Sequence, residues 1–187
     1  MQTLTRTVRS IDKSGASLDI PFRSWSERGI SLRRGEVSMV AGNPGAGKST
    51  IALAVALKSQ QPTLYFSMDS HASTMAIRSL AMITGLPQRE CEERMALDQA
   101  WASDLLALYA GHISWCFDSN PSLYDVEDEI EIYREMKGSD PVLIVVDNAT
   151  DVTHDDGDEF GSLRSLMREC KSWARETNAT FLILHHT

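Results

Sequence analysis

The sequence predicts an α/β fold in which a mostly parallel central sheet carries helices on both faces. Strand-like and helix-like segments alternate along the chain, which is typical of βαβ crossovers between parallel strands. The segment P-V-L-I-V-V at 141–146 is an uninterrupted apolar run of the kind that strands buried on both faces display. A glycine-rich loop, G-N-P-G-A-G-K-S at 42–49, lies between a strand-like and a helix-like segment. The 187 residues are enough for one such domain.

Each element follows from apolar periodicity and from the turn residues that bound it. The predicted strands lie at 36–41, 63–68, 112–117, 141–146 and 180–184. The predicted helices lie at 50–59, 73–84, 90–109, 123–137 and 160–174. Gly85-Leu86-Pro87 ends the second helix, and Asn120-Pro121-Ser122 supplies a turn and an N-cap for the acidic fourth helix. In the last helix seven apolar residues from Phe160 to Ala174 recur at helical spacing, which indicates a core-facing stripe.

The net charge of −8 is concentrated in one part of the chain. Residues 1–34 hold seven Lys/Arg against three Asp/Glu, whereas residues 118–159 hold two against fourteen. Surfaces that bind nucleic-acid phosphates carry clustered Lys/Arg, so the 118–159 segment is not predicted to contact nucleic acid. We interpret it as the solvated face of a helix and a loop.

Hydropathy and cysteine spacing predict a cytoplasmic protein without a membrane partner. The sequence contains no apolar run of 18 residues, and its N-terminus lacks the apolar stretch of a signal peptide. Cys91, Cys116 and Cys170 are widely spaced and do not match a metal-binding pattern. They are predicted to be reduced, structural thiols.

The glycine-rich loop matches the phosphate-binding P-loop pattern G-x-x-x-x-G-K-[ST]. Its glycines let backbone N–H groups point at phosphate oxygens, and the helix that follows adds the partial positive charge of its N-terminus. Lys48 supplies a charge for the β- and γ-phosphates, and the Ser49 hydroxyl is a Mg²⁺ ligand in this pattern. The sequence therefore predicts ATP and Mg²⁺ as ligands. The residues expected to hold the nucleotide are Gly42, Asn43, Pro44, Gly45, Ala46, Gly47, Lys48, Ser49 and Thr50.

Four further candidates lie at the carboxyl ends of predicted strands, where ligands bind in such sheets. Asp147 follows five apolar residues and is predicted to hold the Mg²⁺ shell, with a helix or loop cap as the alternative. Asp69 is a candidate general base that orients the attacking water, or a cap for the next helix. His185 and His186 are candidate sensors of the γ-phosphate, or simply exposed side chains.

A different hypothesis assigns a metal cluster, such as a nuclease needs, to the polar loop after Asp147. The spacing matches neither the Ca²⁺-binding loop nor a zinc pattern, which disfavours it. Its members would be His154, Asp155, Asp156 and Asp158, with His185 or His186.

The order of these motifs resembles the RecA-like ATPase core of DnaB-type replicative helicases and their phage relatives, over roughly residues 20–187. The segment at 33–50, R-R-G-E-V-S-M-V-A-G-N-P-G-A-G-K-S-T, looks like the family's entry into its glycine loop. F-S-M-D-S at 66–70 is similar to the family's F-S-L-E-M, whose Glu polarises the attacking water, and R-S-L-A at 78–81 fits the helix after it. L-I-V-V-D at 143–147 resembles the Walker B strand. His185-His186-Thr187 resembles members with a histidine pair where others have a Gln sensor.

This resemblance implies a RecA-like P-loop NTPase fold, with an N-terminal arm at 1–20 and an ATP-binding core at 21–187. It implies a motor that hydrolyses ATP with Mg²⁺, acts on single-stranded DNA in replication or recombination, and forms a homo-oligomeric ring. Lys48 and Asp69 would act in catalysis, with His185 or His186 sensing the γ-phosphate. The basic residues that serve ring packing or DNA, or else form an ordinary solvated surface, are Arg23, Arg28, Arg33 and Arg34.

Three departures from the family pattern lead to a second hypothesis. Asp69 is one methylene shorter than Glu, which sets its carboxylate roughly 1.5 Å back and predicts slow hydrolysis. The sequence stops at Thr187, where the family continues with further strands, a DNA-contacting loop and an arginine finger. The loop after Asp147 is acidic. The alternative function is therefore a weakly hydrolysing RecA-like regulator or recombination mediator that acts through protein contacts of the 118–159 segment.

Overall fold

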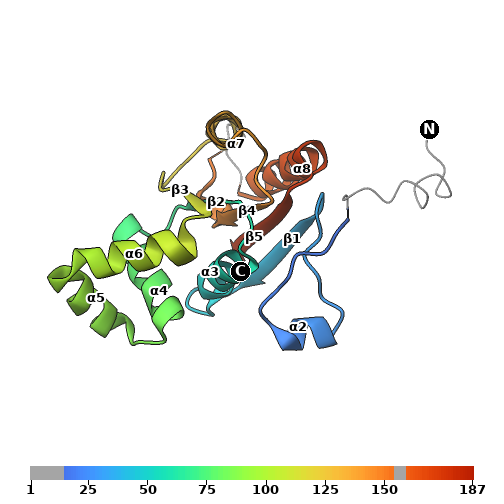
Figure 1. The fold of residues 1–187 in the computed structure, drawn as a ribbon. Helices are drawn as coiled ribbons and strands as arrows, with labels where there is room; N and C mark the ends of the chain where they lie inside the picture. Colours follow the sequence, from blue (N-terminus) through green and yellow to red (C-terminus); the bar gives the residue numbers. More distant parts are fainter. Residues whose placement is uncertain (1–14, 154–158) are drawn as a thin grey trace.

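Five parallel strands form the centre of the molecule (Figure 1). The computed structural model describes residues 15–153 and 159–187. The strands are β1 (Val37–Gly42), β2 (Thr63–Ser67), β3 (Ile113–Cys116), β4 (Leu143–Asp147) and β5 (Thr180–His186). They lie in the order β1-β5-β4-β2-β3, and each neighbouring pair is parallel. This arrangement confirms the predicted fold class.

Helices cover both faces of the sheet (Figure 1). One face carries α3 (Lys48–Ser59), beside a lobe made of α4 (Ala72–Thr84), α5 (Gln88–Leu97) and α6 (Gln99–Ala110). The opposite face carries α7 (Leu123–Lys137) and α8 (Glu159–Thr177). Two short elements, α2 (Arg23–Glu27) and the 3₁₀ helix η1 (Ala149–Asp151), precede β1 and follow β4. No helix within the described ranges combines the length and the hydrophobicity of a transmembrane span.

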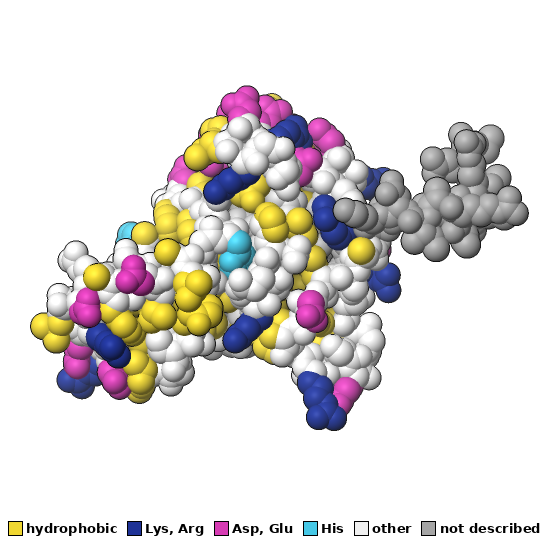
Figure 2. Space-filling view, in the orientation of Figure 1, with side chains coloured by type: hydrophobic (Ala, Val, Ile, Leu, Met, Phe, Trp, Pro, Cys, Tyr) yellow, Lys and Arg dark blue, Asp and Glu magenta, His cyan; other side chains and the backbone are white. Residues whose placement is uncertain are grey.

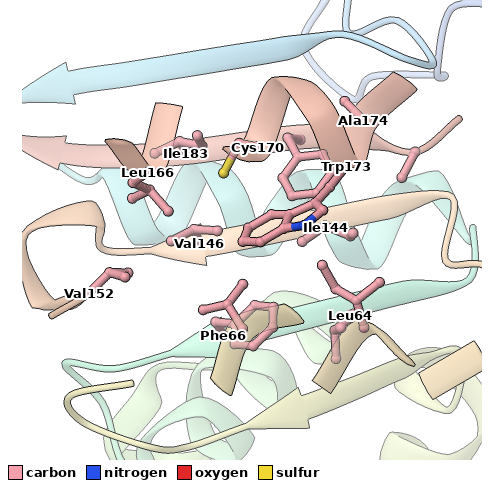
Figure 3. Close-up of a cluster of buried hydrophobic side chains, with 14 of the residues drawn as sticks. Leu64, Phe66, Ile144, Val146, Val152, Leu166, Cys170, Trp173, Ala174 and Ile183 are labelled. Carbon is pink, nitrogen blue, oxygen red and sulfur yellow. The ribbon is translucent and has the colours of Figure 1, made fainter. Parts of the chain in front are cut away.

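Side chains of the three central strands alternate between two cores, because successive residues of a strand point to opposite faces. The core beneath α7 and α8 takes Leu64, Phe66, Ile144, Val146, Phe181 and Ile183 (Figure 3). The core beneath α3 takes the intervening Tyr65, Leu143, Val145, Leu182 and Leu184. The apolar run in β4 is therefore buried on both faces, as its composition predicted.

The acidic helix has the predicted bounds because its two ends carry strong signals. The Ser122 Oγ accepts a hydrogen bond from the Asp125 N–H at 3.2 Å, and the Asp125 carboxylate accepts one from the Ser122 N–H at 2.7 Å. This reciprocal pair is a capping box. Gly138 ends the helix with a φ of 69°.

The segment predicted as a single helix at 90–109 forms two helices, α5 and α6, so that prediction was wrong. The chain breaks at Asp98, whose side chain accepts a hydrogen bond from the Trp101 N–H at 3.0 Å and caps α6. An aspartate that binds nearby backbone N–H groups favours a new helix start over continuation. The helix α2 was not predicted.

The three cysteines are free thiols, as predicted. Cys91 packs with Leu80 and Ala102 in a small core inside the α4–α6 lobe. Cys170 lies on the buried face of α8, and that burial raises the pKa of its thiol to about 12. A thiol with so high a pKa stays protonated, which fits a structural position.

Candidate active site

The glycine-rich loop joins β1 to α3, and among the described residues no side chain caps the first turn of that helix. Gly47 is its N-cap with a φ of 86°, and Gly45 has a φ of 78°. Residues with a Cβ rarely adopt this left-handed conformation, so the turn requires glycine at both positions. At Gly42 an added Cβ would make only an ordinary contact, 3.7 Å from Ala46 Cβ. The loop therefore leaves the N–H groups of a helix N-terminus available to an anion.

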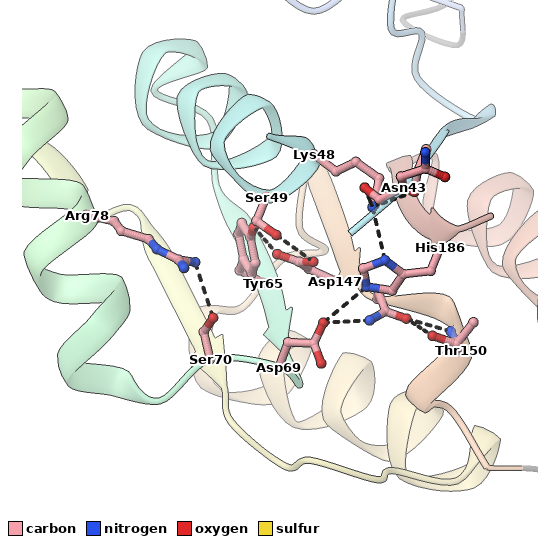
Figure 4. A network of polar contacts seen from close by, with 12 residues as sticks. Asn43, Lys48, Ser49, Tyr65, Asp69, Ser70, Arg78, Asp147, Thr150 and His186 are labelled. Atoms are coloured by element: carbon pink, nitrogen blue, oxygen red, sulfur yellow. Dashed lines mark hydrogen bonds and ion pairs between the residues drawn. The ribbon is translucent and has the colours of Figure 1, made fainter. Parts of the chain in front are cut away.

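The Lys48 side chain folds back over this loop and is only 6% exposed (Figure 4). Its Nζ donates to the carbonyl oxygens of Gly42 at 2.7 Å and Asn43 at 3.0 Å. It also lies 3.1 Å from Nδ1 of His186, at the end of β5. The ammonium group thus connects the loop to the carboxyl edge of the sheet.

Asp147 ends β4, and its two carboxylate oxygens have different partners. Ser49 Oγ donates to Oδ1 at 3.1 Å, and the buried Tyr65 hydroxyl donates to Oδ2 at 3.0 Å. Burial raises the pKa of Asp147, and these two hydrogen bonds oppose that rise. Burial, followed by the neighbouring Asp147, raises the pKa of Tyr65 well above its usual value, so the phenol stays a donor. Ser49 and Asp147 therefore meet as a P-loop Mg²⁺ site requires, and their oxygens suit that ion.

Asp69 lies in the bend after β2. Side chains from the ends of β4 and β5 contact its carboxylate (Figure 4). Asn148 Nδ2 donates to Asp69 Oδ2 at 2.7 Å, and His186 Nε2 lies 3.4 Å from the same oxygen. Because the Lys48 ammonium can only donate, Nδ1 of His186 accepts, and Nε2 carries the proton that points at Asp69. The N-cap of α4 is His71, so the alternative of Asp69 as a helix cap does not apply.

A second carboxylate, Asp151 of η1, interacts with Asp69. Burial raises the pKa of Asp151 to about 6; the charge of Asp69 and a hydrogen bond to it add to the rise, while His186 opposes it. Neighbouring carboxylates resist ionising together, so Asp151 holds its proton more readily than an isolated acid would. The edge of the sheet therefore contains a pair of acids beside a histidine.

The structure separates the two histidines. His186 reaches Lys48 and Asp69, whereas His185 precedes it on β5 and so points to the opposite face of the sheet. Nδ1 of His185 is buried, and within the described ranges it has no hydrogen-bond partner. Residues 154–158, which carry His154, Asp155, Asp156 and Asp158 of the nuclease hypothesis, lie outside the described residues.

Four side chains at this edge were not predicted: Tyr65, Arg78, Asn148 and Asp151. Arg78 of α4 donates to Ser70 Oγ at 3.2 Å, and its charge weakly opposes the rise that burial causes in the pKa of Asp147. Its place in the R-S-L-A segment was a usable signal. Tyr65 had none, because a tyrosine inside an apolar strand looks like a core residue.

Residues 10–187 match the family described as the AAA domain. The chain belongs to the AAA domain family. Its fold is that of RecA-like P-loop ATPase domains: the structure of a DnaB-like replicative helicase superimposes with a TM-score of 0.75, at 13% identity, over 98% of this chain and 47% of that one. A solved ATPase domain superimposes with a TM-score of 0.77, also at 13% identity, over 98% of this chain and 68% of its own.

Two relatives share more of the sequence with this AAA domain. The Gene 65 protein of Mycobacterium phage L5 is 36% identical over 179 residues, covering 92% of this chain and 66% of that protein. The replicative DNA helicase DnaB of Pasteurella multocida (strain Pm70) is 29% identical over 133 residues, covering 66% of this chain and 28% of the helicase. The chain thus spans just under two thirds of the phage protein's length, and the RecA-like core resembles that of DnaB-type helicases, as predicted.

Proposed function

We propose that this AAA domain binds ATP with Mg²⁺ and hydrolyses it as the motor core of a DNA helicase. The observation that carries the proposal is the meeting of Lys48, Ser49, Asp69, Asp147 and His186 at one edge of the sheet. These side chains come from the loops or ends of β1, β2, β4 and β5. The likeness to replicative DNA helicase DnaB supports DNA as the partner and a homo-oligomeric assembly.

The roles follow the chemistry of each group. The nine residues from Gly42 to Thr50 hold the triphosphate through backbone N–H groups and the Lys48 charge. Ser49 and Asp147 hold Mg²⁺, which neutralises phosphate charge when bound. Asp69 accepts the proton of the attacking water, and Asn148 keeps that carboxylate aimed by its 2.7 Å hydrogen bond. His186, with its Nε2 proton, senses the γ-phosphate.

A second candidate function is a regulator that binds nucleotide and hydrolyses it weakly. The specific observation in its favour is that Asp69, already shorter than a glutamate, is held back by Asn148 and His186. Asp69→Glu separates the two functions. A motor limited by reach gains turnover in this variant, whereas a regulator evolved for binding alone does not.

The test is ATP turnover measured with and without single-stranded DNA, in the wild type and in Lys48→Ala. The motor function predicts turnover that DNA stimulates and that Lys48→Ala abolishes. If the protein binds nucleotide but shows no turnover at any DNA concentration, the motor function is wrong and the regulator function is supported. Cleavage of DNA that survives Lys48→Ala would instead support the nuclease hypothesis.

A further inference from the structure

The outer face of α8 carries a basic stripe, defined here as Arg164, Arg168, Lys171 and Arg175, all of them exposed. Their spacing of four, three and four residues places them within one narrow arc of the helix surface, because an α-helix has 3.6 residues per turn. The stripe runs about 16 Å along the helix at 1.5 Å per residue. Four cations in one row stand out in a chain whose net charge is −8.

Two carboxylates of the same helix lie to one side of this row. Glu169 and Glu176 each lie about 100° around the helix from the arginine that precedes them, since each residue advances the direction by that angle. Glu169 Oε1 does reach Arg168 Nε at 3.0 Å, and the Arg168 side chain is 76% exposed. Ion pairs this exposed contribute about 0–1 kcal/mol, so Arg168 can exchange Glu169 for another anion.

A second basic segment, Arg33 and Arg34, lies near the C-terminal end of α8. Arg34 Nε donates to the backbone oxygen of Asn178 at 2.7 Å, and the Gly35 N–H donates to that of Ala179 at 3.0 Å. The basic segment before β1 therefore packs against the end of the basic helix. In Figure 2 carboxylates gather at the top, over α7, and Lys and Arg side chains are spread over this face, some of them toward the right.

The chemistry of the stripe selects among classes of partner. Protein interfaces bury aromatic and aliphatic anchors, and membrane-bound helices insert apolar side chains. The large hydrophobic side chains that are exposed among those described all lie outside α8. Beside the cations this helix offers small polar residues, Ser165 and Ser172. The exposed Tyr124 of α7 lines a pocket with Arg168 and Glu169, but α8 itself offers charge without exposed apolar anchors. Such a row of cations suits the phosphate backbone of a nucleic acid, which is bound mainly through its charge.

We propose that the basic stripe of α8 binds the phosphate backbone of single-stranded nucleic acid without reading its bases. This inference rests on the proposed function, which calls for a DNA partner, and it assigns that contact to a surface. The position of α8 suits coupling, because this helix joins the segment after Asp147 to the strand that carries His186. A nucleic acid bound to α8 is therefore connected through the polypeptide chain to Asp147 on one side and to His186 on the other.

The test compares two triple variants of the full chain that lose equal charge. Arg168→Gln/Lys171→Gln/Arg175→Gln removes three cations of the stripe, and Lys58→Gln/Arg89→Gln/Lys137→Gln removes three exposed cations elsewhere. Binding of a fluorescent 20-mer of dT is measured without nucleotide over a range of salt concentrations. For a single strand, each lost phosphate contact reduces the magnitude of the slope of log K against log salt by about 0.7. The slope of the stripe variant should therefore be smaller in magnitude by about 2.

The expected result is loss of at least about tenfold in affinity for the stripe variant alone. A 20-mer of U should bind the wild type about as tightly, because the stripe contacts phosphates and not sugars. Equal loss in both triple variants would show a long-range charge effect and overturn the assignment, as would a wild type that binds neither oligomer. Self-association that only the stripe variant loses would point to the acidic face of a second copy instead.

Nucleotide binding by the same variants separates this inference from the proposed function. All of them keep the glycine-rich loop, so each should bind a fluorescent ATP analogue as the wild type does. If the wild type binds the oligomers through α8 but binds no nucleotide, the proposed function is wrong and the assignment of the stripe as a nucleic-acid site is supported. If the wild type binds nucleotide and the stripe variant binds the dT oligomer with wild-type affinity, the assignment of the stripe is wrong and the proposed function is unaffected.

Discussion

The interior and the carboxyl edge of the same sheet differ in what their side chains contribute. In the interior, β4 and β5 present Val146 and Ile183 to the core beneath α8, where side chains are almost fully buried. One to three residues further on, Asp147 and His186 make polar contacts to other strands and loops. The interior holds the strands in register, and the edge uses that register to gather charged groups. Substitutions in the two regions should therefore separate stability from nucleotide chemistry.

The largest effect on stability is expected from Trp173→Ala. Trp173 is buried in the core beneath α8, with its ring 6.4 Å from that of Phe181. Removing a buried aromatic side chain lowers the free energy of unfolding by about 3–5 kcal/mol. Urea denaturation of Trp101→Ala gives the matched control. Trp101 is only partly buried, between Arg94 at 4.3 Å and the small core of Leu80 and Cys91, so Trp101→Ala should lower the free energy of unfolding by only about 1–2 kcal/mol. Equal losses would contradict the core assignment.

Lys48→Ala should produce the reverse pattern, with a large functional loss and little change in stability. Removing one charged donor from a site that stabilises developing charge lowers turnover by about 10²–10³. The control is Lys58→Ala, at an exposed position on the same helix α3. Steady-state turnover and thermal unfolding of both variants check the prediction. A fall in Tm as large as that of Trp173→Ala would place Lys48 in the scaffold instead.

Tyr65→Phe tests a residue that belongs to both regions. Its ring is buried and lies 4.7 Å from that of Trp115, while its hydroxyl holds Asp147 Oδ2. The variant keeps the ring and loses one hydrogen bond to a charged group, worth about 1.5–3 kcal/mol. We expect the Mg²⁺ concentration for half-maximal turnover to rise about tenfold, with Mg²⁺-free nucleotide binding unchanged. Tyr133→Phe, in α7, should leave both quantities unchanged; a shift there would assign the effect to general packing.

The smallest effect is a pH-dependent gain in stability from Asp151→Asn. The pKa of Asp151 is about 6 in the folded chain against 3.8 without the fold, so ionisation disfavours folding as pH rises through this range. Asparagine stays neutral. The variant should therefore be more stable than the wild type at pH 7.5, by at most about 1 kcal/mol after solvent screening. The difference should vanish below pH 4. A gain that is the same at both pH values would exclude the Asp69–Asp151 pair as its cause.

The sequence predicted the interior better than the edge, for a physical reason. Apolar runs report burial directly, so the strands were found with errors of at most two residues at their ends, and α7 was found with the bounds that the structure has. The edge depends on which strands become neighbours, and β5 lies between β1 and β4 although it comes last in the chain. Periodicity carries no information on that order. It left His185 and His186 equivalent, and it gave no reason to bring Asp151 toward Asp69.

The site residues supplied by a local motif were easier to find. The glycine-rich loop contains both Lys48 and Ser49 within one turn, so their proximity needs no tertiary information. Tyr65 and Asn148 act through side chains that cross from one element to another. Their roles follow only from distances, and a tyrosine in an apolar strand or an asparagine in a loop has many simpler explanations.

The most direct test of the central proposal is the effect of Mg²⁺ on binding of a non-hydrolysable ATP analogue, measured by calorimetry. If Ser49 and Asp147 hold the ion beside the phosphates, Mg²⁺ should tighten binding to the wild type by at least about tenfold, or 1.4 kcal/mol. The same addition should do little for Asp147→Asn, which keeps the shape of the carboxylate without its charge. Equal tightening in both proteins, or no binding by the wild type, would contradict the assignment of this edge as a Mg²⁺–ATP site.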